Sequence, residues 1–238
     1  MNPEHAIRRA QVYSFLTGAC LYPDANWLED FPAATVIAAE LGFVEDDPTA
    51  LPDQTFSVEE LRSEFRQTFG LAGSQCYETE IGLPHEFRQS QEMADIAGFY
   101  EAFGFRTGGA VRERPDHLAV ELEFMSVLAL KEALALAHGN TEQAEICQDA
   151  QQKFLADHLA RWVGLVSESL RRLNPNLSAE AARAKPYLEL TRFCAEFTLA
   201  DARRLGIHPQ RRPPAEMAPT PFNPDFSCET CPATEELG

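Results

Sequence analysis

The chain has 238 residues, 45% of them hydrophobic and 24% charged, so it is long enough to bury a substantial core. Its formal net charge of −17 argues against binding to nucleic acid or to an anionic membrane surface, which both favour a basic protein, and would suit a basic partner. No segment approaches the ~20 consecutive apolar residues of a membrane span.

The first predicted helix covers residues 4–21. Within it, Arg8 and Arg9 precede a moderately apolar stretch that ends at Cys20, an order that resembles an export signal. Glu4 and the polar residues inside the stretch do not fit such a signal, whereas the helical spacing of the segment indicates a folded helix. We therefore expect a cytoplasmic protein whose six cysteines are reduced.

Two further helices are predicted before the middle of the chain. One begins at a capping box formed by Ser57 and Glu60 and ends at Gly70, with apolar residues at helical spacing between them. Residues 70–85 contain three glycines and no clear period, which indicates a loop. The next helix is expected over residues 87–103.

The stretch "ERPDHLAVELEFM", residues 113–125, opens a long apolar segment. Its alternation of apolar residues and glutamates would suit a strand, but strong helix formers continue as far as His138, and this length favours a helix. Pro115 fits the first helical position, where a missing N–H group costs nothing. Asp116 would then lie in the first turn, where a negative charge complements the helix macrodipole.

Residues 141–173 and 187–205 are predicted to form the last helices. Residues 207–238 contain seven prolines and show no hydrophobic period, which indicates an extended tail. Strand signals are scarce throughout the chain. The sequence therefore predicts an all-α fold followed by a Pro-rich C-terminal tail.

The tail contains the one metal-like motif of the sequence, Cys228-x-x-Cys231. Such a pair supplies two of the four ligands that a structural zinc ion needs, so Cys76, His208 or a second chain would have to complete the site. The alternative is an exposed pair of reduced thiols. No other motif requires a cofactor, because phosphate-binding loops, dinucleotide-binding motifs and zinc-protease helices do not occur.

Asp116 and His117 need a further explanation. The start of a helix accounts for Asp116, but it disfavours a protonated His117 and leaves the flanking Glu113 and Arg114 unexplained. Asp116, His117 and Glu121 could serve as an acid–base catalyst, which needs few other groups. The alternative is that these charges are directed at a partner.

The same stretch resembles the E-x-P-D-H-(I/L)-x-x-E-L-x-F-M signature of TorD/DmsD/NarJ-type chaperones, the maturation proteins of molybdenum oxidoreductases. Other segments resemble the same family: "RRAQVYSFLTGACLYP" is similar to its first helix, "LRSEFRQTFG" to its Leu-x-x-Glu-aromatic-x-x-x-Phe segment, "CYETEIGLPHEF" to a loop that usually reads Tyr-Glu-Ser, and "ADIAGFYEAFGF" to the helix before the signature. The resemblance covers most of residues 5–205. It is greatest to the branch that serves dimethyl-sulfoxide-reductase-type enzymes.

This resemblance implies a TorD-like bundle of roughly ten helices over residues 1–206. The bundle would have a larger N-terminal part, to about residue 110, and a smaller C-terminal part, from about residue 111. Residues 207–238, with the CxxC motif, are not part of the family pattern. The resemblance therefore says nothing about the role of the tail.

The resemblance also implies a system-specific cytoplasmic chaperone without enzymatic activity. Such a chaperone binds the N-terminal peptide, often a twin-arginine signal, of the catalytic subunit of a molybdenum oxidoreductase of the dimethyl-sulfoxide-reductase type. It assists the insertion of the molybdopterin cofactor before export, alongside the machinery that delivers the cofactor. The alternative function is a metal- or thiol-carrying accessory protein that uses Cys228 and Cys231.

The family positions associated with peptide binding fall on the signature and on the loop before it, where Thr79 replaces the usual serine. The implied peptide-binding residues are Asp116, His117, Glu113, Glu121, Tyr77, Glu78 and Pro84. A twin-arginine peptide brings two guanidinium groups and an apolar run. An acidic lip beside an apolar helical groove would be a suitable receptor for it.

Overall fold

The computed structural model describes residues 2–44, 56–70, 76–81, 86–108, 113–178, 181 and 184–209. The regular structure of this part is helical, and its extended pairing is limited to an isolated bridge between Tyr77 and His117, so the predicted all-α fold is confirmed. The α-helices of the described part are α1 (Pro3–Ala19), α2 (Phe31–Glu40), α3 (Val58–Phe69), α4 (Glu86–Ala102), α5 (Leu118–Ala137), α6 (Thr141–Phe154), α7 (Ala160–Leu173) and α9 (Pro186–Arg204). Short helical turns join them: η1 (Trp27–Glu29) and η2 (Glu78–Glu80), which are 3-10 turns, and η3 (Leu155–Leu159), which is a π-turn.

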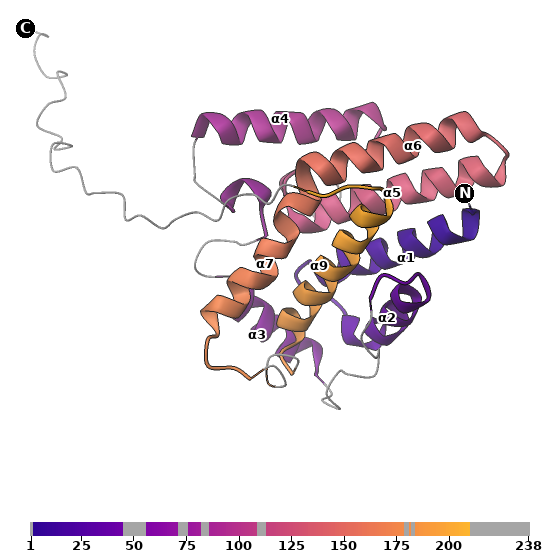
Figure 1. The fold of residues 1–238 in the computed structure, drawn as a ribbon. Helices are drawn as coiled ribbons and strands as arrows, with labels where there is room; N and C mark the ends of the chain where they lie inside the picture. Colours follow the sequence, from indigo (N-terminus) through magenta and orange to yellow (C-terminus); the bar gives the residue numbers. More distant parts are fainter. Residues whose placement is uncertain are drawn as a thin grey trace, which may run out of the picture.

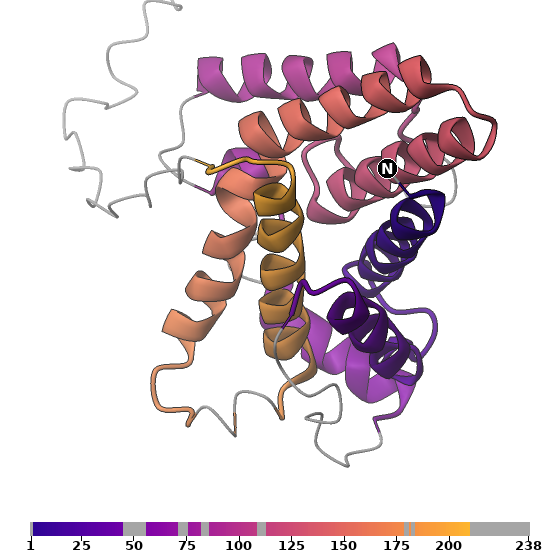
Figure 2. The same ribbon diagram turned by 45° about the vertical axis from the view of Figure 1, so that its right-hand side comes forward.

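Helix α5 is central to the arrangement. It packs along α1 on one side and α6 on the other, and α4 lies along the outer side of α6 (Figure 1). Helices α7 and α9 form a second pair that runs away from this group, with α3 packed against α9 (Figure 2). The two groups contact each other at the first turns of α5, where the indole of Trp162 in α7 donates a hydrogen bond to Glu121, and also between α1 and α9.

One continuous apolar core extends through both groups of helices. Four apolar residues at helical spacing along α5 lie in it and are buried: Leu118, Leu122, Met125 and Leu128. Full burial of one such side chain stabilises the fold by about 1.5–3 kcal/mol. The core therefore fixes the position and rotation of α5, and with them the position of the signature residues at its start.

The N-terminal segment forms the predicted helix, and Arg9 lies inside the protein. Its guanidinium donates hydrogen bonds to Glu132 (3.1 Å), Asp201 (2.8 Å) and Gln151, which belong to α5, α9 and α6. The hydroxyl of Tyr13 donates to the same Asp201 carboxylate at 2.9 Å. In the folded chain Arg9 thus ties four helices together.

The prediction that α5 begins at Pro115 is wrong. The helix begins at Leu118, and His117 is its N-cap, because the backbone of His117 is extended (φ −77°, ψ 137°) and pairs with Tyr77. Asp116 therefore lies before the helix, and its expected place in the first turn is also wrong. Its role has to be explained by contacts other than the helix macrodipole.

The helix predicted over residues 141–173 is interrupted. Helix α6 ends at Phe154, the π-turn η3 follows, and α7 continues in a new direction (Figure 1). A π-turn holds an extra residue and shifts the phase of the side chains that follow it. Here it places His158 in the interior, with its Nδ1 atom 3.1 Å from Oε2 of Glu78.

Several predictions concern residues outside the described part of the chain. Pro84, Cys228 and Cys231 lie there, so the metal hypothesis for the tail stays a prediction. The division of residues 1–206 near residue 110 also stays a prediction. Among the described helices, none combines the length and the apolar composition of a membrane span.

Candidate functional site

The structure brings together the two predicted motif segments, which are some forty residues apart in the sequence. The antiparallel bridge joins Tyr77, just before η2, to His117, just before α5. Next to it, the backbone N–H of Glu78 donates to the carbonyl of Asp116 at 2.9 Å. The loop motif and the signature therefore form one site.

Four of the predicted site residues lie inside this site. Their exposed fractions are 0% for Asp116, 0% for Glu121, 2% for Glu78 and 5% for His117. We call these four residues the buried layer. Burial of an ionised group without a partner is unfavourable, so each of these groups is expected to be either paired within the protein or uncharged. Their direct contact with a partner molecule stays a prediction.

Asp116 has a partner within the chain. The Nε and Nη2 atoms of Arg114 donate to its two carboxylate oxygens at 2.9 and 2.6 Å, and the hydroxyl of Thr79 donates to it at 2.6 Å. The hydrogen bond to Asp116 is the main reason why the pKa of Arg114 is raised. Arg114 also pairs with Glu80 at 2.7 Å, and its guanidinium lies 4.3 Å from the centroid of the Tyr77 ring.

His117 acts as a neutral cap. Burial lowers its pKa, which leaves the imidazole uncharged near neutral pH. Its Nδ1 atom then accepts a hydrogen bond from the backbone N–H of Ala119 at 3.1 Å, and its ring packs edge-on against Tyr77 with centroids 4.9 Å apart. The objection that a protonated histidine is disfavoured at a helix N-terminus therefore does not apply to this residue.

Glu121 lies deeper, beside the carboxylate of Glu78. Burial, and then the negative charge of Glu78, raise the pKa of Glu121 well above its usual range, which favours the protonated carboxyl group in the folded state. Oε2 of Glu121 accepts the hydrogen bond from Trp162 at 3.0 Å. Glu78 faces His158, whose Nε2 atom lies 3.3 Å from Asp95, an exposed residue of α4.

The raised pKa of Glu121 predicts a pH-dependent gain in stability for Glu121→Gln. Between its ordinary pKa and the raised one, the folded state binds a proton that the unfolded state releases, so rising pH destabilises the wild type through this group. Glutamine can still accept from Trp162 and cannot ionise. We expect Glu121→Gln to melt at least a few degrees higher relative to wild type at pH 8 than at pH 5.

Thermal melting at the two pH values measures this difference. The matched control is Glu123→Gln, which removes an exposed carboxylate two residues away in the same helix. A Glu121→Gln shift that is the same at both pH values would contradict a protonated Glu121 in the folded protein.

An outer group of side chains covers the buried layer. We call Tyr77, Glu80, Glu113 and Arg114 the lip. The hydroxyl of Tyr77 donates to the Glu113 carboxylate at 2.7 Å, and burial together with this bond raises the pKa of Tyr77. All four lip residues are partly exposed, which makes them the part of the site that a partner can reach.

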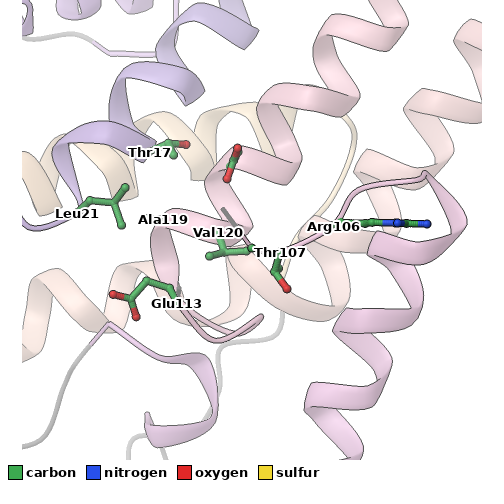
Figure 3. Close-up of a pocket in the computed structure, with 9 residues that line it drawn as sticks. Thr17, Leu21, Arg106, Thr107, Glu113, Ala119 and Val120 are labelled. Atoms are coloured by element: carbon green, nitrogen blue, oxygen red, sulfur yellow. The ribbon is translucent and has the colours of Figure 1, made fainter. Parts of the chain in front are cut away.

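A cavity of about 280 Å³ adjoins the lip, between the end of α1 and the first turns of α5 (Figure 3). Leu21, Ala119 and Val120 give it an apolar wall, while the carboxylates of Glu113 and Glu123 add negative charge. In Figure 3 the guanidinium of Arg106 extends away from Glu113. The cavity can therefore take an aliphatic side chain next to a basic group.

Sequence reasoning missed three groups of this site. Arg114 was recognised as an unexplained charge, and its spacing to Asp116 could have suggested the pair. His158 and Trp162 carried no local signal, since both reach the site through the π-turn and α7.

The acid–base hypothesis named three residues that are all buried: Asp116, His117 and Glu121. In the part of the chain that the structure covers, no group of three or more His, Cys, Asp or Glu residues is arranged to hold a metal ion.

Comparison with known proteins relates the chain to assembly chaperones. A family model described as nitrate reductase delta subunit matches residues 49–168. The chlorate reductase assembly chaperone protein of Ideonella dechloratans is 30% identical over 165 residues, covering 68% of this chain and 78% of that protein. The selenate reductase assembly chaperone protein of Thauera selenatis is 34% identical over 184 residues, covering 76% and 82%. The perchlorate reductase assembly chaperone protein of Dechloromonas aromatica (strain RCB) is 39% identical over 74 residues, or 31% and 32%.

Proposed function

The chain belongs to the nitrate reductase delta subunit family of TorD/NarJ-type maturation chaperones, and from this premise we propose that it assembles one particular reductase of the dimethyl-sulfoxide-reductase type. We call the catalytic subunit of that reductase the client. The names of the relatives, which serve chlorate, selenate and perchlorate reductases, support a client of this kind. The family assignment made from the sequence is confirmed.

On this proposal the chaperone binds the N-terminal peptide of the client, a twin-arginine segment followed by an apolar run. The observation that carries it is the cavity beside the lip, where Glu113 adjoins an apolar wall formed by Leu21 and Val120. An arginine of the peptide would pair with the Glu113 carboxylate while an aliphatic side chain enters the cavity. The net charge of −17 would speed the encounter with a basic segment.

The predicted peptide-binding residues then fall into two roles. Glu113 and Tyr77 contact the peptide directly, because they lie in the lip. The buried layer supports the lip: Asp116 accepts hydrogen bonds from Arg114, and His117 packs against Tyr77. The backbone N–H of Glu78 donates to the carbonyl of Asp116, and Glu121 is bonded to Trp162 below them. Pro84 is kept as a predicted contact, although it lies outside the described residues.

The proposed setting is the cytoplasm, where the client would receive its molybdopterin cofactor before export. The chaperone would hold the client peptide during that step and catalyse no reaction itself. The alternative of a metal or thiol carrier rests on Cys228 and Cys231, and no comparison supports it. Zinc at these two cysteines stays a prediction.

Purification of the protein from its own source, with identification of the bound subunit by mass spectrometry, tests the proposal. We expect the catalytic subunit of a molybdenum reductase, recovered with its N-terminal peptide intact. Glu113→Gln should lower the recovery several-fold, because it removes a carboxylate that pairs with the peptide. Glu145→Gln, which removes an exposed charge from α6, should leave recovery unchanged. Recovery of no reductase subunit, or equal recovery with both variants, would contradict the proposal.

A further inference from the structure

We propose that Tyr77, Thr79, Glu80 and Asp116 form a guanidinium-binding site, that Arg114 of the same chain occupies it, and that an arginine of the partner peptide takes the place of Arg114. The existence of the site follows from the contacts of Arg114 alone. The identity of the competing arginine rests on the proposed function.

The site contacts one edge, both terminal nitrogens and one face of the guanidinium group. One edge makes two parallel hydrogen bonds to Asp116, the geometry in which arginine binds a carboxylate most strongly. Nη1 donates to Glu80 at 2.7 Å and Nη2 also donates to Thr79 at 2.9 Å. The flat face lies over the Tyr77 ring, where a cation is attracted by the aromatic electrons.

The acceptors and the donor of this site differ in their burial. Asp116 and Thr79 are buried, and Gln89 of α4 donates a further hydrogen bond to the Thr79 hydroxyl at 3.1 Å. The side chain of Arg114, in contrast, is 37% exposed and comes from the segment before α5, outside any helix. Two buried acceptors, Asp116 and Thr79, with an accessible donor are the arrangement of a binding site.

Exchange of one guanidinium for another avoids the main obstacle to opening the site. If Arg114 simply left, the carboxylate of Asp116 would remain buried without a cation, which is strongly unfavourable. An incoming arginine restores both the positive charge and the two parallel N–H donors. A lysine would restore the charge but not the two parallel bonds, so the site should discriminate between the two residues.

Arg114 then acts as an intramolecular competitor. A group tethered two residues from Asp116 is present at a high effective concentration, which weakens the apparent affinity for any external arginine. A partner must gain additional contacts to displace it. The cavity beside Glu113 provides such contacts within the same site.

The first test uses guanidinium ion itself as the probe. Arg114→Ala should melt below wild type and regain at least half of the loss in about 20 mM guanidinium chloride, relative to the same concentration of sodium chloride, because the ion binds the vacated folded-state site. Wild type and the double variant Arg114→Ala/Asp116→Asn should show no gain. Should Arg114→Ala fail to fold, Arg114→Gln, which leaves the site without a cation but keeps a polar side chain, is measured in the same way. If guanidinium chloride does not raise the melting temperature of the single variant above its value in sodium chloride, the proposed guanidinium-binding site is wrong.

The second test uses a synthetic peptide with two adjacent arginines followed by leucines and alanines, and its lysine counterpart. Removal of the competitor should make Arg114→Ala bind the arginine peptide about tenfold more tightly than wild type, with little gain for the lysine peptide. Binding that is weaker than wild type would overturn the displacement. If guanidinium restores Arg114→Ala but neither protein binds the arginine peptide, the displacement and the proposed function fail and the guanidinium site stands.

Discussion

Arg9→Met is expected to lower the free energy of unfolding by about 3–5 kcal/mol, because it leaves two buried carboxylates without their shared cation. Arg9, Glu132 and Asp201 are all buried, and they belong to three different helices. Burial alone would raise the pKa of Asp201, but the charges of Arg9 and Arg204 outweigh it and lower that pKa. Chemical denaturation at pH 7 measures the loss.

The neighbouring residue provides the control. Arg8 pairs with Glu4 and Glu40 on the surface, where such pairs contribute under ~1 kcal/mol, so Arg8→Met should change stability little. The double variant Arg9→Met/Asp201→Leu should recover part of the loss, since it also removes a buried carboxylate that has lost the charge of Arg9 and keeps only that of Arg204. If Arg8→Met and Arg9→Met lower the free energy of unfolding equally, the buried ion pairs of Arg9 contribute no more to stability than the surface pairs of Arg8.

Asp116→Asn is expected to weaken binding of the twin-arginine peptide at least about tenfold, or ~1.4 kcal/mol. The substitution keeps the shape of the side chain and its ability to accept from Thr79, but it removes the buried negative charge that a guanidinium needs. Arg114 is partly exposed and can be solvated once the charge is gone, so the melting temperature should change by only a few degrees. Fluorescence titration and thermal melting of the same preparation give both values.

A double-mutant cycle connects this prediction to Arg114. If both residues act at one guanidinium site, Arg114→Ala should tighten peptide binding only while Asp116 is present. In the Asp116→Asn background the same change should have little effect. Additive effects of the two substitutions would place the peptide elsewhere on the molecule.

Local signals in the sequence were sufficient to place most of the helices. The capping box is an example: the Ser57 hydroxyl accepts from the Glu60 N–H at 3.3 Å, and the Glu60 carboxylate accepts from the Ser57 N–H at 2.8 Å. Both partners lie within four residues, so the pattern can be read without the fold. Helix α2 was missed because its ten residues carry no side-chain N-cap hydrogen bond and no clear amphipathic period.

The site could be predicted only in part, because its geometry depends on residues far apart in the chain. The sequence indicated that Asp116 and His117 matter, but their burial follows from the pairing of η2 with the start of α5. The break at η3 follows from contacts such as that between His158 and Glu78, which are eighty residues apart. A periodic pattern of apolar residues records neither contact.

Calorimetric titration of the purified protein with the N-terminal peptide of its co-purified client measures whether the chaperone recognises a basic client segment. We expect saturable 1:1 binding that weakens partially as salt is raised, since screening affects the ion pairs and not the apolar contacts. Replacement of both arginines of the peptide by glutamine should reduce affinity at least about tenfold. An absence of binding at millimolar peptide, or equal affinity for the glutamine peptide, would contradict recognition of a basic client segment by the lip.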